Sequence, residues 1–172
     1  SSSGTVTAAF DGNGTFTGNL GTAVTTVATG VTMTAAANIV AGKTVNKAGT
    51  GALAVQVGNA NAAVDLTTIA GTAFASVTVT ADVTFTGTLD DTVATSVNNG
   101  VTLTTTAAKV TAKTLSGSGT VAVTALDATL AADLSNVSST TVTAAFSANG
   151  TFTGDLGTAV TTVASGVTLT AA

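Results

Sequence analysis

The chain has 172 residues, of which Thr supplies 41, Ala 34, Val 23 and Gly 19. Only 7% of the residues are charged, four Lys against eight Asp, whereas an ordinary soluble domain has about 25%. Because the sequence contains no Cys, His or Arg, it lacks the ligands of ordinary zinc, haem and iron–sulfur sites and the groups of Ser-His-Asp or Cys-His catalysis. We therefore expect no catalytic residue, cofactor or metal, and the net charge of −4 excludes a nucleic-acid partner.

The remaining composition favours strands. Val and Thr are β-branched and pack well on a pleated surface, and the 45% of apolar residues argue against disorder. Residues 12–42 carry no charge, but Gly18, Gly21 and Gly30 interrupt them, so they contain no apolar stretch of about 18 residues that would span a membrane. The sequence predicts an all-β protein without membrane insertion.

Short alternating runs recur from the beginning of the chain to its end. Apolar residues take every second position, as in VTMT at 31–34 and VTVT at 77–80. The runs begin at Val6, Val31, Leu53, Val77, Val101, Val121, Val142 and Val167. A period of two predicts strands with one buried face.

Weaker apolar clusters flank each run. Those before a run contain Leu20, Val45, Leu66, Leu89, Leu115, Leu134 and Leu156, and those after it contain Phe16, Ile39, Val64, Phe85, Val110, Leu130 and Phe152. Three short strands separated by turns, repeating about every 23 residues, predict the coil of a parallel β-solenoid. We expect about seven coils in one continuous domain over residues 1–172.

The sequence also contains repeats that are longer than the period of about 23 residues. Residues 5–36 and 141–172 are identical at 27 of 32 positions and are offset by 136, so the repeat unit covers 5–140 and a second copy starts at 141. Within the unit, TFTG recurs at 15–18 and 84–87, which indicates two degenerate halves of about 68 residues. Six coils at a strand spacing of about 4.8 Å would advance about 29 Å per unit. We interpret the sequence as a window cut from a longer tandem array.

Two acidic segments are candidate sites. Asp11-Gly12-Asn13-Gly14 resembles the start of a calcium loop, but the sequence contains no Glu to close it, and we interpret it as a turn. The adjacent pair Asp90-Asp91 could serve acid–base catalysis, as in a β-helical polysaccharide lyase or hydrolase. Adjacent residues on a strand point to opposite faces, so we interpret this pair as solvated turn acids.

The outward face offers two further patterns. Thr32/Thr34, Thr78/Thr80, Thr102/Thr104 and Thr168/Thr170 should point outward, in an interrupted threonine ladder that resembles the ice-binding face of β-solenoid antifreeze proteins. Lys43/Lys47 and Lys109/Lys113 have the spacing of a helix face. The Gly, Thr and Val around these lysines favour solvated charges at the corners of the coil.

The run GVTLTTTAAKVTAKTLSGSGTVAVTALDATLAADLSNVSSTTVTAAF at 100–146 resembles the tandem β-strand repeats of giant bacterial surface proteins. These include long adhesins, S-layer-like proteins and type I-secreted extracellular proteins. The resemblance covers the whole chain and implies an extracellular or cell-surface structural array. It brings no catalytic or binding motif, so it assigns no residue a role. Because each end coil of a solenoid exposes unpaired strand edges, we expect neighbouring copies as partners, through covalent tandem repeats or through end-to-end or lateral filament assembly.

These observations predict a structural protein. We expect a repeat segment of a long bacterial surface or extracellular filament, in which stacked coils act as a stiff shaft, with no small-molecule ligand. The alternative is an adhesive or ice-binding module that uses the outward Thr-x-Thr face. An enzyme, such as a β-helical polysaccharide lyase or hydrolase, is the third hypothesis. It ranks last because such an enzyme needs a groove lined with acidic residues, and the sequence has only scattered Asp residues.

Overall fold

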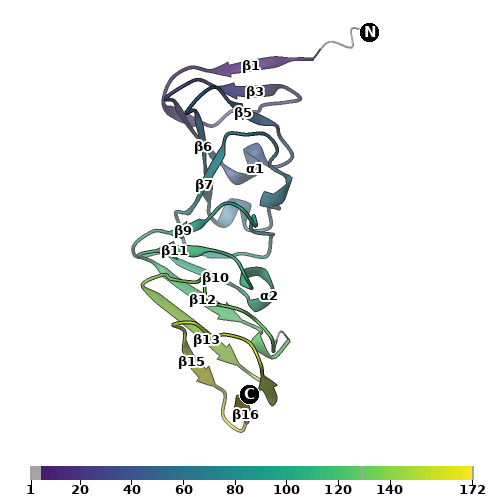
Figure 1. Cartoon of the computed structure of the whole chain (residues 1–172), viewed down its shortest axis with the longest axis vertical. Helices are drawn as coiled ribbons and strands as arrows, with labels where there is room; N and C mark the ends of the chain where they lie inside the picture. Colours follow the sequence, from purple (N-terminus) through teal and green to yellow (C-terminus); the bar gives the residue numbers. More distant parts are fainter. Residues whose placement is uncertain (1–4, 129, 172) are drawn as a thin grey trace.

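The computed structural model describes residues 5–128 and 130–171. Its strands stack one above another along a single long axis, with the N-terminus at one end and the C-terminus at the other (Figure 1). All of the strand pairs are parallel, and the chain makes about 8 turns. The predicted parallel β-solenoid is confirmed.

Within the described residues the strands form four sheets. The six-stranded sheet contains β2 (Gly14–Phe16), β4 (Thr32–Ala36), β6 (Ala52–Val57), β7 (Phe74–Val79), β9 (Thr95–Val97) and β11 (Leu115–Gly117). The five-stranded sheet contains β8 (Val83–Thr84), β10 (Thr102–Thr106), β12 (Thr120–Thr124), β13 (Thr141–Phe146) and β15 (Val160–Val163). The three-stranded sheet contains β1 (Thr7–Phe10), β3 (Val24–Val27) and β5 (Val45–Lys47), and β14 (Gly150–Phe152) pairs with β16 (Leu169–Ala171).

Short helical turns replace strands on part of some coils. After β4 the chain passes through α1 (Ala37–Val40) and β5 before it returns as β6, which pairs with β4. The other turns are α2 (Ala107–Val110), η1 (Asn59–Asn61), η2 (Leu66–Thr68) and η3 (Leu126–Ala128). Ile39 and Val110, which we expected in short strands, therefore lie in helices. The neighbouring Ala residues explain this difference, because Ala has the highest helix propensity and a low strand propensity.

The observed coil is shorter than the length of about 23 residues that the spacing of the alternating runs predicted. Five coils separate Phe16 from Leu115 in the six-stranded sheet, which gives about 20 residues a coil, at the short end of the range for stacked repeats. The spacing was overestimated because the alternating runs do not all lie on one side of the solenoid. The run at Val77 pairs in the six-stranded sheet, whereas those at Val121 and Val142 pair in the five-stranded sheet. The repeat unit thus makes between six and seven coils and rises by about 32 Å.

The two copies of the duplicated segment pair in the same register. Thr143 pairs with Val160 as Thr7 pairs with Val24, and β14 pairs with β16 as β2 pairs with β4. Equivalent strands of the two halves of the unit lie in different sheets. β4 lies in the six-stranded sheet, and its counterpart β10 lies in the five-stranded sheet. Each half therefore contains a fractional number of coils, and equivalent features move from one side of the solenoid to the next.

One apolar core runs along the inside of the stack. In the strands between the two end coils the inward positions are buried, which confirms the predicted alternation, whereas β1, β2, β15 and β16 contain no buried residue. The fully buried large side chains of this core include Met33, Leu53, Leu66, Phe85, Leu89, Leu103, Leu115, Leu126, Leu134 and Phe146. The helices of the described part of the chain are too short to cross a membrane.

Candidate functional surfaces

The five-stranded sheet carries a regular column of threonines. Thr102, Thr120 and Thr141 are register partners on three successive coils, and none of them is buried. Their neighbours Leu103 and Val121 point into the core. The alternation of the strand therefore places this column on the outer face of the sheet.

Alanines interrupt the Thr-x-Thr ladder, as the sequence predicted. Thr34 stacks on Ala54 and Ser76 in the six-stranded sheet, whereas Thr104 stacks on Ala122 and Thr143 in the five-stranded sheet. The predicted pairs thus lie in different sheets. The column at Thr102 was missed because the period averaged over the alternating runs did not align these positions.

Asp90 and Asp91 have separate contacts. The Asp90 carboxylate accepts hydrogen bonds from the backbone N–H groups of Thr92 and Val93, at 2.7 and 2.9 Å, and from the Thr92 hydroxyl. Asp91 is exposed and forms an ion pair with Lys113. Burial alone would raise the pKa of Asp90, but these hydrogen bonds and the nearby Lys113 lower the pKa overall. The two carboxylates are a turn cap and an ion-pair partner.

Four Asn and Asp side chains join successive coils. Asn13 Oδ1 accepts the backbone N–H of Thr32 at 2.6 Å, and Asn149 accepts that of Thr168 in the second copy. Asp82 and Asp127 accept the N–H groups of Thr102 and Ser147. In the segment Asp11–Gly14, Gly12 and Asn13 form a bend and Gly14 begins β2, and its Asn13 has this structural contact. The sequence alone did not indicate these contacts, because each spans about one coil.

Hydrogen bonds lower the pKa of several Asp side chains, which predicts acid sensitivity. A bond from Ser147 lowers the pKa of Asp127, and one from Ser135 lowers that of Asp133. A lowered folded-state pKa stabilises the fold above the unfolded pKa, near 4, and this stabilisation is lost as the pH falls through the folded pKa. Thermal unfolding followed by circular dichroism should show a melting temperature that falls below about pH 4. An Asp90→Asn, Asp127→Asn, Asp133→Asn triple variant should show a flatter profile, and an equal fall in that variant would contradict the assignment.

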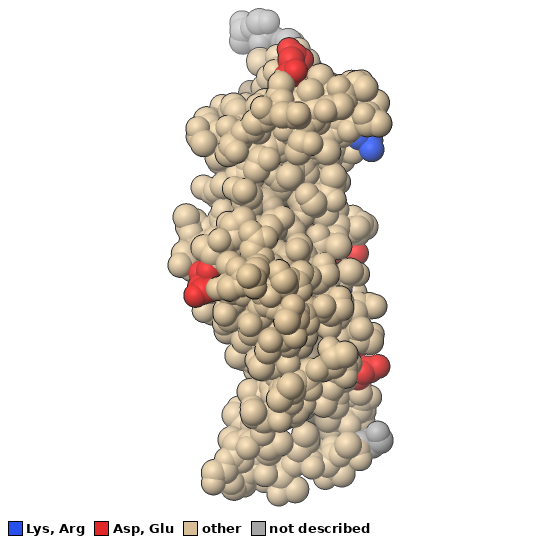
Figure 2. All heavy atoms as spheres, turned by 90° about the vertical axis from the view of Figure 1, so that its left-hand side faces the viewer, with Lys and Arg blue, Asp and Glu red and all other residues tan. Residues whose placement is uncertain are grey.

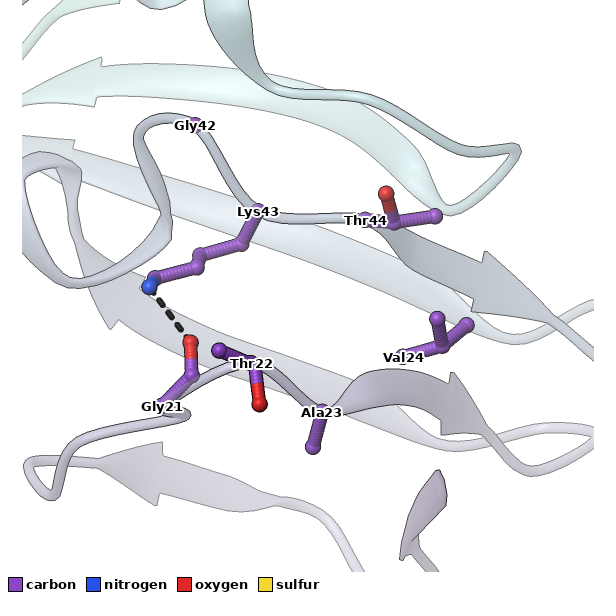
Figure 3. A pocket seen from close by; sticks show the side chains of 7 residues that line it. All are labelled: Gly21, Thr22, Ala23, Val24, Gly42, Lys43 and Thr44. Atoms are coloured by element: carbon purple, nitrogen blue, oxygen red, sulfur yellow. Dashed lines mark hydrogen bonds between the residues drawn. The ribbon is translucent and has the colours of Figure 1, made fainter. Parts of the chain in front are cut away.

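Lys43 and Lys113 are less solvated than predicted, whereas Lys47 is exposed, as predicted. Lys43 is half-buried, and its Nζ donates to the Gly21 carbonyl on the preceding coil at 2.6 Å, across a hollow of about 200 Å³ (Figure 3). Lys113 pairs with Asp91, and Lys109 lies in the last turn of α2. Lys43 and Lys113 therefore link coils, since a buried ammonium needs a polar partner.

Charges do not gather on the visible side of the rod. Figure 2 shows isolated acidic and basic side chains on a surface that is otherwise uncharged. In residues 5–128 and 130–171 no cluster of three Asp side chains is close enough to hold a metal ion. The hollow next to Lys43 is open and lined mainly by small residues.

The two ends of the stack differ from its middle. Val27 is fully buried, but its duplicate Val163 in the last coil is 44% exposed. At the other end Val6 is 59% exposed, whereas its duplicate Val142 is 3% exposed. The sequence around each pair is almost identical, so the difference comes from whether a further coil covers it.

Comparison with known protein families, characterised proteins and solved structures finds no match to this chain.

Proposed function

We propose that this chain is a repeat segment of a long bacterial cell-surface or extracellular filament, in which it acts as a stiff shaft or spacer. The observation that carries the proposal is that coils stack without interruption from one repeat unit into the next, since β12 of the first unit pairs in parallel with β13 of the second and both copies keep the same register. The proposed partners are neighbouring copies, joined as tandem repeats.

Stiffness would come from two features that run along the axis. Parallel ladders of backbone hydrogen bonds link each coil to the next. The core is also continuous from coil to coil, as in other repeat proteins whose stability is a sum of neighbour contacts. Bending the shaft would break hydrogen bonds of the ladders and would also separate packed side chains in the core.

The composition fits such a shaft. Like charges stacked at the strand spacing of about 4.8 Å would repel. Pro would remove a ladder donor, and the sequence contains none. The surface location rests on the resemblance to giant bacterial repeat proteins.

The location can be tested on intact cells of the source organism. An antibody raised against residues 5–171 should label surface appendages without permeabilisation of the cells. Labelling that occurs only after permeabilisation would exclude a surface or extracellular filament.

A second candidate function is adhesion or ice binding by the five-stranded sheet. The supporting observation is the uninterrupted column of Thr102, Thr120 and Thr141 on its outer face. Thermal hysteresis and ice shaping by the purified chain, both abolished by Thr120→Lys, would support ice binding. Ordinary freezing in the presence of the wild-type chain would exclude it.

A further inference from the structure

One turn in the middle of the stack contains an Asn-Gly pair that the rest of the chain does not restrain. Asn99 and Gly100 lie between β9 and β10, and both are exposed. The turn is closed by one hydrogen bond, in which the backbone N–H of Val101 donates to the Asn98 carbonyl at 3.1 Å. Within residues 5–128 and 130–171, neither the Asn99 side chain nor the Gly100 N–H group has a protein hydrogen-bond partner.

An Asn-Gly pair of this kind can react with itself. The backbone nitrogen of Gly100 loses its proton and attacks the side-chain carbon Cγ of Asn99, and the side-chain nitrogen leaves as ammonia with that proton. The product is a succinimide ring. One water molecule then opens the ring at either of its carbonyl groups, which yields aspartate or isoaspartate. One C–N bond forms and one breaks before the hydrolysis, and no atom is oxidised or reduced.

The surroundings of Gly100 leave room for the ring to close. A Cβ atom at this position would have no other atom within 4 Å, so open space surrounds the attacking nitrogen. Closure requires a rotation about the Cα–C bond of Asn99, which the single turn bond from Val101 to Asn98 opposes. The ladder next to the turn stays in place, because the Asn98 N–H donates to the Val79 carbonyl on the preceding coil at 3.1 Å.

The other two Asn-Gly pairs are held by the neighbouring coil. Asn13 Oδ1 accepts the backbone N–H of Thr32, and Asn149 Oδ1 accepts that of Thr168, each at 2.6 Å. In the second copy the attacking nitrogen is also engaged, since the Gly150 N–H donates to the Thr168 carbonyl at 3.2 Å. These bonds turn the carboxamide toward the next coil and away from the nitrogen of the following Gly. The two pairs can therefore react only when the coil opens locally.

We infer that Asn99 is a site of spontaneous deamidation, and that each 136-residue unit carries one such site. The same turn recurs at Thr29-Gly30 and Ser165-Gly166, where the Gly φ angles are 74° and 78° against 74° at Gly100, but Thr and Ser have no amide to lose.

The conversion changes both the charge and the main chain of this turn. Aspartate or isoaspartate adds a negative charge next to β10, and isoaspartate also lengthens the main chain between β9 and β10 by one methylene group. Older chains therefore become more acidic than new ones. The inference concerns this turn alone and does not depend on the proposed shaft function.

The test follows the folded whole chain during incubation at mildly alkaline pH, which favours loss of the proton from the attacking nitrogen. Cleavage after the lysines places each Asn-Gly pair in a different peptide, so mass spectrometry measures the three conversions separately. Asn99 should convert at least about tenfold faster than Asn13 and Asn149, and it should yield both aspartate and isoaspartate. In guanidinium chloride the three should convert at similar rates, because Gly follows each of them. Equal rates in the folded chain would overturn the inference.

Asn99→Thr is the matched control, because the chain itself has Thr29 at the equivalent turn. This variant should keep the circular dichroism spectrum of the wild type and should lose the acidic form that accumulates on ion exchange. Accumulation of that form at the wild-type rate would overturn the assignment to Asn99.

A longer chain removes any contribution from the ends, because Asn13 and Thr168 lie in the outermost coils. The comparison is repeated in a chain in which residues 37–172 follow Ala172 a second time, so that coils enclose Asn149 on both sides. Asn149 should then convert more slowly than Asn99, and conversion of the two at the same rate would contradict the protection by Thr168.

Discussion

Replacing Gly87 with Ala is expected to destabilise the protein by about 3 kcal/mol or more. A Cβ atom at this position would lie 2.0 Å from the Val64 carbonyl oxygen on the preceding coil. The backbone cannot move away without breaking the ladder between the two coils. Gly154, at the same place in the next TFTG motif, would meet the Ala132 carbonyl oxygen at 2.0 Å. Chemical denaturation of the Gly87→Ala and Gly154→Ala variants measures the loss.

Gly18 is the matched control, because it ends the first TFTG motif at the uncovered end of the stack. The atoms nearest to its Cβ would belong to the Phe16 ring, the closest at 3.0 Å. This ring is only half-buried and can move, so Gly18→Ala should cost less than about 1 kcal/mol. Equal losses at Gly18 and Gly87 would show that the motif glycine serves the local turn and has no part in coil stacking.

Replacing Phe146 with Ala should cost about 3–5 kcal/mol, the usual range for a buried Phe. Phe146 is fully buried, and its ring packs edge-on against Phe152 with centroids 5.4 Å apart. The substitution would leave a cavity between coils that are held on both sides by neighbours. Urea denaturation, with hydrogen exchange to locate the affected coils, measures the effect.

The duplicate Phe10 provides the control for Phe146. It lies in the same TVTAAF sequence, but it is half-buried and its ring centroid is 6.5 Å from that of Phe16. Phe10→Ala should therefore cost less than half as much. A loss equal to that of Phe146→Ala would mean that the two copies are equally covered in solution, against the observed difference between the ends.

Much of the fold could be predicted from the sequence because it depends on local patterns. Alternation at residues such as Leu103 and Val121 indicated strands with one buried face, and the duplication of 5–36 at 141–172 indicated stacking in register. These signals are strong because every coil must bury the same face.

The coil length and the threonine column could not be predicted, because both depend on how the chain turns its corners. The helix α1 and the bulge between Leu53 and Ala54 alter the residue count of individual coils. A period averaged over the chain therefore aligned the wrong threonines. The bond from Asn13 to Thr32 was likewise hidden, since only the folded coil brings these residues together.

Coils stack continuously across the boundary between repeat units, where β12 pairs with β13. The most direct test is small-angle X-ray scattering of a chain in which residues 37–172 are repeated after Ala172. Continuous stacking predicts one longer rod, extended by about 32 Å with an unchanged cross-section. Two rods joined by a flexible link, or a thicker particle, would contradict it.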